Sequence, residues 1–285
     1  MIRLGCTLKL LLLSAWLVGQ TPAETFQFGQ RALQMQNFAL ARLAFERLLF
    51  FEQDSFAFAS ASQLGQIARA ESKFPEAITW FGRAAILAPN DMEKAGLELQ
   101  KAAVYLRMND PMMGQALLLG LPENLPDSLL KYQAFLMGVS YFMQSDFTQS
   151  QQAFKKALSI NDQAGLQKLD SLFGKLARIK HPKPNLARLL SIIIPGAGQF
   201  YAGDIKNGLN SLLLTGGFLT LGIYSMLFYT PFDAIVAIAP WFQRYYMGGY
   251  KRAGMIAADR LNQKQNQVFM QILACFNSSE PQSRQ

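Results

Sequence analysis

The residues best suited to form a site lie in one glycine-rich string, which reads PGAGQFYAGD from Pro195 to Asp204. Its glycines permit a bend and close contact between helices, and Gln199 can hydrogen-bond to backbone groups that the bend exposes. A glycine-rich loop also suggests phosphate binding, but the Lys-Ser or Lys-Thr pair of a P-loop is absent, which disfavours a nucleotide site. The residues of this motif are Pro195, Gly196, Gly198, Gln199, Tyr201, Gly203, Asp204 and Gly208.

Two charged residues in this apolar part of the chain, Asp204 and Arg244, are candidates for an ion pair. A charge near a membrane core is costly, and pairing offsets that cost. The alternative is that Arg244 extends its charge toward water among Trp241, Tyr245 and Tyr246, which are typical of an interfacial aromatic belt.

Residue types for enzymatic chemistry are scarce. The chain has one histidine, His181, which excludes a multi-histidine metal site and a histidine-based triad. We therefore expect no catalytic residues, no cofactor and no metal site, and we predict that the protein is not an enzyme. The enzymatic alternative is a lipid-modifying enzyme, which requires an unpaired carboxylate with a raised pKa at Asp204 or Asp233.

The motif resembles a bacterial membrane-domain family of unknown function that is marked by P-G-x-G-Q-x-Y. That family is itself similar to the two-transmembrane-helix family, which has a Gly-rich F-Y-x-G turn. The resemblance spans about 70 residues of the chain. It implies a compact helical hairpin and brings no established activity.

The elements that position the motif are three apolar stretches, 189–202, 209–229 and 232–250, within a predicted membrane domain over 189–265. The second is 21 residues without a charge, and at about 1.5 Å per residue it spans the hydrocarbon thickness. A short helix bent at Pro195 over 189–202 gives three crossings, and a re-entrant segment there is the alternative. A linker over 181–188, marked by prolines, precedes this domain, and a tail over 266–285 follows it.

Charge and targeting signals predict the topology. The basic residues after 250 favour a cytoplasmic C-terminus under three crossings. Residues 1–23 have the charged start, short apolar core and small residues of a signal peptide, with cleavage after Ala23; an uncleaved anchor is the alternative. Both readings place the region after residue 23 in the periplasm and the C-terminal helices in a bacterial inner membrane.

Residues 24–180 have helical periodicity, so we predict an all-α chain. Three glycines are each followed by a small residue twelve positions later and by a phenylalanine sixteen positions later. The sets are Gly29, Ala41, Phe45; Gly65, Ala77, Phe81; and Gly138, Ser150, Phe154.

This spacing resembles the tetratricopeptide repeat, a pair of antiparallel helices that recurs about every 34 residues. The resemblance implies a helical repeat solenoid of about four pairs, with a degenerate third pair matched by Tyr105 and Ala116, and a final capping helix over 166–179. The implied packing residues are Gly29, Ala41, Phe45, Gly65, Ala77, Phe81, Ala84, Pro89, Gly138, Phe154 and Ala157.

The net charge of +8 is the usual sign of nucleic-acid binding, but many of the basic residues flank the apolar stretches. We therefore expect contact with membrane lipid and no nucleic acid. Stacked repeats leave a groove that commonly binds a protein or peptide, although a rigid spacer without a ligand is the alternative. The predicted function is a non-enzymatic cell-envelope scaffold. A different reading is an accessory factor that handles lipid or peptide through the membrane hairpin.

Overall fold

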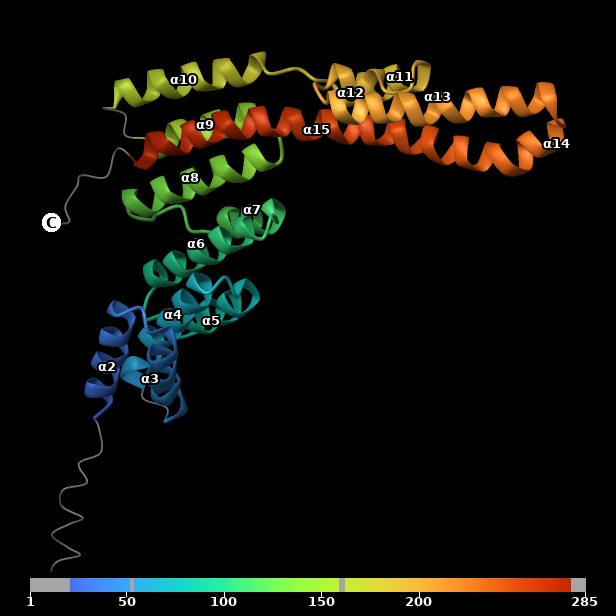
Figure 1. The fold of residues 1–285 in the computed structure, drawn as a ribbon. Coiled ribbons are helices and arrows are strands. Elements are labelled where there is room, and N and C mark those ends of the chain that lie inside the picture. Colours follow the sequence, from blue (N-terminus) through green and yellow to red (C-terminus); the bar gives the residue numbers. More distant parts are fainter. Residues whose placement is uncertain (1–20, 52–53, 159–161, 278–285) are drawn as a thin grey trace, which may run out of the picture. The chain divides into compact units, whose positions relative to one another are not determined.

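The computed structural model describes residues 21–51, 54–158 and 162–277, and all of the regular structure in these residues is helical (Figure 1). The prediction of an all-α chain is therefore confirmed. Two compact units divide at residue 159. Most of the predicted signal peptide, residues 1–20, lies outside the described residues.

The first unit contains four pairs of helices joined by short turns. The pairs are α2 (Pro22–Gln34) with α3 (Phe38–Phe50), α4 (Asp54–Ala70) with α5 (Phe74–Ile86), α6 (Asp91–Arg107) with α7 (Pro111–Leu119), and α8 (Asp127–Met143) with α9 (Phe147–Ala157). The predicted repeat end at Pro89 lies in the link between α5 and α6, just before the N-cap residue Asn90.

The turn inside each pair has the same backbone. One residue in each turn adopts the left-handed region, and the next backbone N–H returns to a carbonyl of the preceding helix, which ends that helix in the same way every time. The left-handed residues are Gln36, Ser72, Asn109 and Ser145. None is glycine, so the recurrence of this turn is not visible in residue type alone.

A small residue opposite a large one sets the distance between the two helices of a pair. A Cβ at Gly65 would lie 2.5 Å from the Phe81 ring, and at Gly29 and Gly138 it would lie 2.9 and 2.7 Å from the phenylalanines sixteen residues after them. All three phenylalanine rings are fully buried. The glycines thus let the first helix approach the ring that the second helix supplies.

The third pair uses the same register with different residues. Ala102 lies seven residues before the left-handed Asn109, as Gly65 lies before Ser72, and Leu118 follows Ala102 by sixteen residues. Both are fully buried in one cluster. Ala102 is larger than the glycine of the other pairs, and Leu118 is smaller than their phenylalanine, so the two changes compensate. Tyr105 keeps the expected register, whereas Ala116 is exposed and is not the packing residue.

The remaining predicted packing residues follow the same pattern. Ala41, Ala77 and Ala84 are fully buried, and Ala157 is half-buried. Ser150 replaces alanine in the fourth pair, and its hydroxyl donates a hydrogen bond of 2.8 Å to the Gly138 carbonyl. A buried hydroxyl at this position is therefore paired within its own helix pair.

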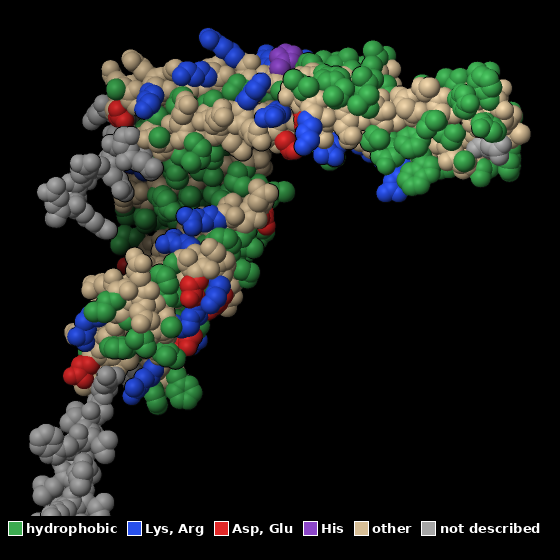
Figure 2. All heavy atoms as spheres, in the orientation of Figure 1, with side chains coloured by type: hydrophobic (Ala, Val, Ile, Leu, Met, Phe, Trp, Pro, Cys, Tyr) green, Lys and Arg blue, Asp and Glu red, His purple; other side chains and the backbone are tan. Residues whose placement is uncertain are grey.

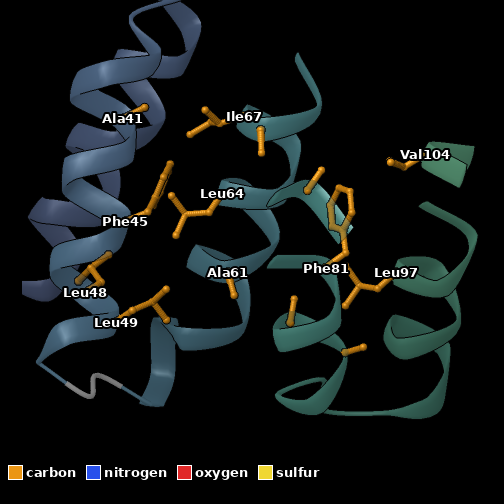
Figure 3. Packing of buried hydrophobic residues seen from close by; sticks show 14 of the residues in the cluster. Ala41, Phe45, Leu48, Leu49, Ala61, Leu64, Ile67, Phe81, Leu97 and Val104 are labelled. Atoms are coloured by element: carbon orange, nitrogen blue, oxygen red, sulfur yellow. The ribbon is translucent and has the colours of Figure 1, made fainter. Parts of the chain in front are cut away.

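Neighbouring pairs share one apolar core. Phe45, Leu64, Phe81 and Leu97 belong to a single buried cluster that runs from α2 to α6 (Figure 3). Because each pair buries its apolar face against the next pair, the stability of the unit depends on stacking as well as on contacts within each pair.

An ion-pair network also joins the first two pairs. The Arg42 guanidinium contacts the carboxylates of Glu71, at 2.8 Å, and Glu76, and Lys73 lies 3.0 Å from Glu71. Hydrogen bonds from Lys73 and Arg42 lower the pKa of Glu71. Burial alone would raise the pKa of Glu76, but hydrogen bonds from Arg42 and Trp80 outweigh it and lower that pKa as well.

The second unit consists of a long hairpin with short helices at its base. Its elements are α10 (Gln163–Arg178), α11 (Pro184–Ile193), α12 (Ala197–Tyr201), α13 (Ile205–Phe228), α14 (Pro231–Asp233), the π-helical turn η1 (Ala234–Ile238) and α15 (Ala239–Asn277). Helices α13 and α15 lie side by side and form the hairpin (Figure 1). Pro240 has no N–H to donate, which accounts for the π-helical turn just before it.

The structure differs from the predicted limits of the three apolar stretches. Residues 189–202 do not form one bent helix, because the chain breaks at Gly196, which has a φ of 93°, and leaves two helices of 10 and 5 residues. Neither helix is long enough to cross a hydrocarbon core of about 30 Å. The stretch 232–250 is divided among α14, η1 and α15, and α15 continues to Asn277, into the predicted tail. The predicted linker shortens because α11 begins at Pro184.

The predicted capping helix over 166–179 lies in α10, which belongs to the second unit and packs against α15. Its buried face consists of Leu169, Leu172, Phe173 and Leu176. Lys264 of α15 donates a hydrogen bond of 3.2 Å to the carbonyl of His181, just after α10. Helix α10 therefore lies beside the C-terminal part of α15.

The equivalence of Gly65–Phe81 and Ala102–Leu118 predicts a coupled pair of substitutions. We expect Gly65→Ala to destabilise the protein by roughly 1–3 kcal/mol through overpacking, and Phe81→Leu by a similar amount through a cavity. The double variant should recover about 1 kcal/mol or more of the summed loss, because it reproduces the third pair. Chemical unfolding of the full chain in detergent measures all three. Gly82→Ala is the control, since a Cβ there meets no atom within 4 Å. Strict additivity would contradict the equivalence.

The Arg42 network predicts a dependence of stability on pH. Because the pKa values of Glu71 and Glu76 lie below the ordinary 4.5, their stabilising contribution is complete above that value and is lost as the pH falls through the lowered pKa. Arg42→Met should therefore cost about 1 kcal/mol at pH 7 and less at a pH well below 4.5. Thermal unfolding at both pH values measures this, with Lys131→Met, which removes an exposed pair with Asp127, as the control. An equal loss at both pH values would contradict the assignment.

Candidate functional site

The glycine-rich motif forms the base of the hairpin, where four helices meet. The closest approach is at Gly198, where a Cβ would lie 1.8 Å from the carbonyl oxygen of Ala187 in α11. The backbone N–H of Gly198 donates a hydrogen bond of 2.9 Å to the Ser191 hydroxyl. Any residue other than glycine would therefore separate α12 from α11.

Gln199 joins three helices through one side chain that is almost completely buried. Its carbonyl oxygen accepts a hydrogen bond of 2.8 Å from Ser191 in α11, and its amide nitrogen donates one of 2.9 Å to the Gly249 carbonyl in α15. The sequence predicted that Gln199 bonds to backbone groups, and this geometry provides such a bond. Gln199 is a positioning residue at the centre of the base.

Gly196 and Gly208 allow α12 to lie against α13. Gly196 adopts a left-handed φ, and a Cβ there would lie 2.4 Å from the Gly208 carbonyl. A Cβ at Gly208 would lie 2.7 Å from the Phe200 ring. Pro195 is half-buried at the break between α11 and α12.

Tyr201 closes the base on the side of α10. Its hydroxyl accepts a hydrogen bond of 3.1 Å from the backbone N–H of Lys183 and lies 3.0 Å from Nδ1 of His181. The aromatic residue of the motif therefore holds the link between α10 and α11 against the hairpin.

Asp204 begins α13 and does not pair with Arg244. Its carboxylate accepts hydrogen bonds from the backbone and the side-chain nitrogens of Asn207, at 3.0 and 2.6 Å, while Gly203 supplies the left-handed turn before it. These two bonds, with weaker attraction from Arg260 and Arg252, lower the pKa of Asp204. Among the described residues no ion pair joins Asp204 to Arg244, so the predicted pair is not formed. A lowered pKa is also the opposite of what a lipid-modifying carboxylic acid at this position requires.

Arg244 instead borders a hollow of about 250 Å³ between α12, α13 and α15. Polar residues that the sequence analysis did not single out also line it: Ser211 and Thr215 from α13, and Gly249 and Arg252 from α15. A sequence pattern could have identified the α13 residues of the hollow. Asn207, Ser211 and Thr215 recur every four residues and so form a polar face on an otherwise apolar helix.

The far part of the hairpin is apolar and exposed. Helix α13 is the one helix, in the part of the chain that the structure describes, with the length and hydropathy to cross a membrane, and 11% of its apolar window is buried. Between Lys206 and Arg244 the sequence contains a single charged residue, Asp233. Figure 2 shows this hydrophobic surface over α13 and the start of α15. The most exposed of these side chains are Leu213, Leu227, Phe228, Tyr229 and Phe232.

The first unit carries a separate hollow of about 370 Å³ between α8 and α9. Its lining mixes apolar residues such as Leu130 and Met137 with the charged residues Asp127, Lys131 and Lys156. A lining that mixes apolar and charged residues suits a peptide or helix better than a small apolar molecule.

No protein-family model matches the chain, and neither the curated proteins nor the solved structures include a significant match to it.

The contact at Gly198 predicts a local loss of order. Gly198→Ala places a methyl group against the Ala187 carbonyl and should destabilise the hairpin base by about 3 kcal/mol or more. Hydrogen exchange of the full chain in detergent should show loss of protection in α11 and α12, with the first unit unchanged. Gly217→Ala in α13 is the control, because a Cβ there meets no atom within 4 Å. Unchanged protection in Gly198→Ala would disprove this account of the motif.

Proposed function

We propose that this chain is a membrane-anchored scaffold whose helix pairs bind a protein partner and whose hairpin inserts into the bacterial inner membrane. The observation that carries the proposal is the long, exposed and almost uncharged surface of α13 and the start of α15. An exposed apolar surface of this extent in water marks a membrane or interaction site. The 24 residues of α13 extend about 36 Å, enough for a bilayer core.

The charges support the same placement. Lys183, Arg188, Lys251 and Arg260 lie at or near the base of the hairpin, whereas its tip carries no basic residue. Basic side chains near the surface of a bilayer are attracted to anionic lipid headgroups by about 1 kcal/mol each. This pattern favours a hairpin inserted tip-first, with its base at the headgroups.

Packing within the second unit also bears on sidedness. Helix α10 lies beside the C-terminal part of α15, and two helices in contact outside the membrane must be on the same side of it. We therefore propose two crossings, formed by α13 and the start of α15. The C-terminus then lies with α10 and, if residues 1–23 act as a signal peptide, on the periplasmic side. This replaces the cytoplasmic C-terminus expected from charge alone.

The first unit supports the role of a scaffold. Four helix pairs with one turn geometry and a shared small-to-large contact are what a tetratricopeptide-like solenoid requires, and we propose that architecture for it. Solenoids of this kind present a groove to a peptide or helix, and the hollow between α8 and α9 has suitable chemistry. We propose a protein or peptide as the partner.

Charges placed on the hairpin should release the protein from the membrane. We expect Leu213→Lys combined with Leu219→Lys, both on exposed positions of α13, to shift much of the protein from the membrane fraction to the soluble fraction, because each lysine near the bilayer centre costs about 2.5–3.5 kcal/mol. Flotation of lysates after carbonate extraction measures this. The control places the same charges on exposed apolar positions of the first unit, Ile86→Lys with Met112→Lys, which should still float.

The same experiment tests the role of the first unit when it is followed by crosslinking in intact cells and mass spectrometry. Recovery of the same few envelope proteins through crosslinks to α8 and α9 would support a scaffold. If wild-type protein fails to float, membrane anchoring is wrong. Flotation without any crosslinked protein, and with lipid co-purifying, would reject the scaffold in favour of an accessory factor that handles lipid through the hairpin.

A further inference from the structure

The hollow between α12, α13 and α15 is lined mainly by polar residue types, although it lies beside α13, a helix apolar enough to cross a membrane. Arg244 and Arg252 border it from α15, and Asn207, Ser211 and Thr215 line it from one face of α13. Its volume of about 250 Å³ is below the roughly 300–1,000 Å³ of sites that enclose a whole small molecule. It therefore suits a small polar group at the end of a larger ligand.

Two hydroxyl groups in the hollow have no partner among the described residues. The side-chain oxygens of Ser211 and Thr215 are inaccessible to solvent and form no hydrogen bond, and Thr215 is 1% exposed. Thr220 in the same helix behaves differently, because its hydroxyl donates to the Gly216 carbonyl one turn earlier. A buried hydroxyl without a partner is unfavourable, so each of these two residues keeps an unused hydrogen-bond donor at the wall of the hollow.

The guanidinium groups of Arg244 and Arg252 form no ion pair within the described part of the chain. The Asp204 carboxylate is occupied by Asn207, and Arg252 attracts it only weakly. A guanidinium is suited to bidentate contact with phosphate oxygens. Two guanidinium groups and two free hydroxyls thus form a set of donors for an anion that bears several oxygens.

Glycine keeps the hollow open. A Cβ at Gly249 would lie 2.7 Å from the Ser211 hydroxyl, and the carbonyl of the same glycine is held by Gln199. The motif residue Gln199 therefore positions the wall of the hollow, which links the glycine-rich string to a binding role rather than to packing alone.

The place of the hollow along the hairpin identifies the source of the phosphate. It lies where the apolar surface of α13 gives way to the basic base, next to Tyr245 and near Trp241, and aromatic residues of this kind mark the interface of a bilayer. In an inserted hairpin this is the depth of the lipid headgroups, and this step rests on the proposed function.

We propose that this hollow binds the phosphate group of an anionic phospholipid, with Arg244 and Arg252 contacting the phosphate oxygens and Ser211 and Thr215 donating hydrogen bonds to them.

The test uses the full chain in neutral detergent and measures binding of phosphatidylglycerol by native mass spectrometry, with phosphatidylcholine as the competing lipid. We expect wild-type protein to retain phosphatidylglycerol and Arg244→Gln with Arg252→Gln to bind it at least tenfold more weakly. The matched control, Lys168→Gln with Lys175→Gln, removes the same charge from exposed positions of α10, outside the hollow, and should bind as wild type does. Equal loss in both double variants would overturn the proposal in favour of general surface charge.

A second variant separates binding from folding. Thr215→Val removes an unpartnered hydroxyl, so it should raise the midpoint of thermal unfolding without lipid while weakening the retention of phosphatidylglycerol. A variant that unfolds earlier, or that binds lipid unchanged, would overturn the role of this hydroxyl. Inorganic phosphate is tested in parallel. If it displaces phosphatidylglycerol at equal concentration, the site is one for free phosphate and the assignment to lipid is wrong.

Failure of this inference is distinguishable from failure of the proposed function. If the hollow does not bind phospholipid, wild-type protein still floats with membranes. If the hairpin is not inserted, wild-type protein does not float, whatever the result in detergent.

Discussion

Where the backbone of Gly198 meets the carbonyl of Ala187, there is room for a hydrogen atom and for nothing larger. This approach brings the Ser191 hydroxyl to the Gly198 N–H and places Gln199 so that one side chain bonds to both α11 and α15. The same group of contacts positions the start of α13, through Gly196 and Gly208, and the Gly249 backbone, through Gln199. The hairpin therefore depends on a base in which Gly196 and Gly198 replace side chains with backbone contact.

The first unit satisfies a related constraint by pairing unequal volumes. A glycine faces a phenylalanine in three pairs, and an alanine faces a leucine in the other, so the distance between the helices is kept while the residues change. Cores tolerate substitutions that conserve total volume better than those that alter it. The pairs then share a continuous apolar cluster from α2 to α6, which ties the order of each pair to that of its neighbours.

The sequence predicted the all-helical class and the register of Gly29, Gly65 and Gly138, because spacing within a helix pair is short-range and leaves a clear residue pattern. It assigned the third pair poorly. In that pair Ala102 and Leu118 stand where the pattern has glycine and phenylalanine, so the residue types do not match. The motif around Gly198 was located, but its partners were not. Gly249 meets Gln199 through a contact between residues 50 positions apart, which leaves no local signal. The Asp204–Arg244 pair was expected because an unpaired charge near a membrane core is costly. In the structure Asn207, three residues away, donates hydrogen bonds to the Asp204 carboxylate instead.

Helix α15 continues without a break from the hairpin to the segment beside α10, over 39 residues. An α-helix of that length extends about 58 Å and bends little. If its first part lies in a bilayer, a change in bilayer thickness that alters its tilt moves the other end by an amount proportional to its length. Helix α10 is packed against that end, so an inserted hairpin would turn hydrophobic mismatch into a displacement of α10 at the membrane surface.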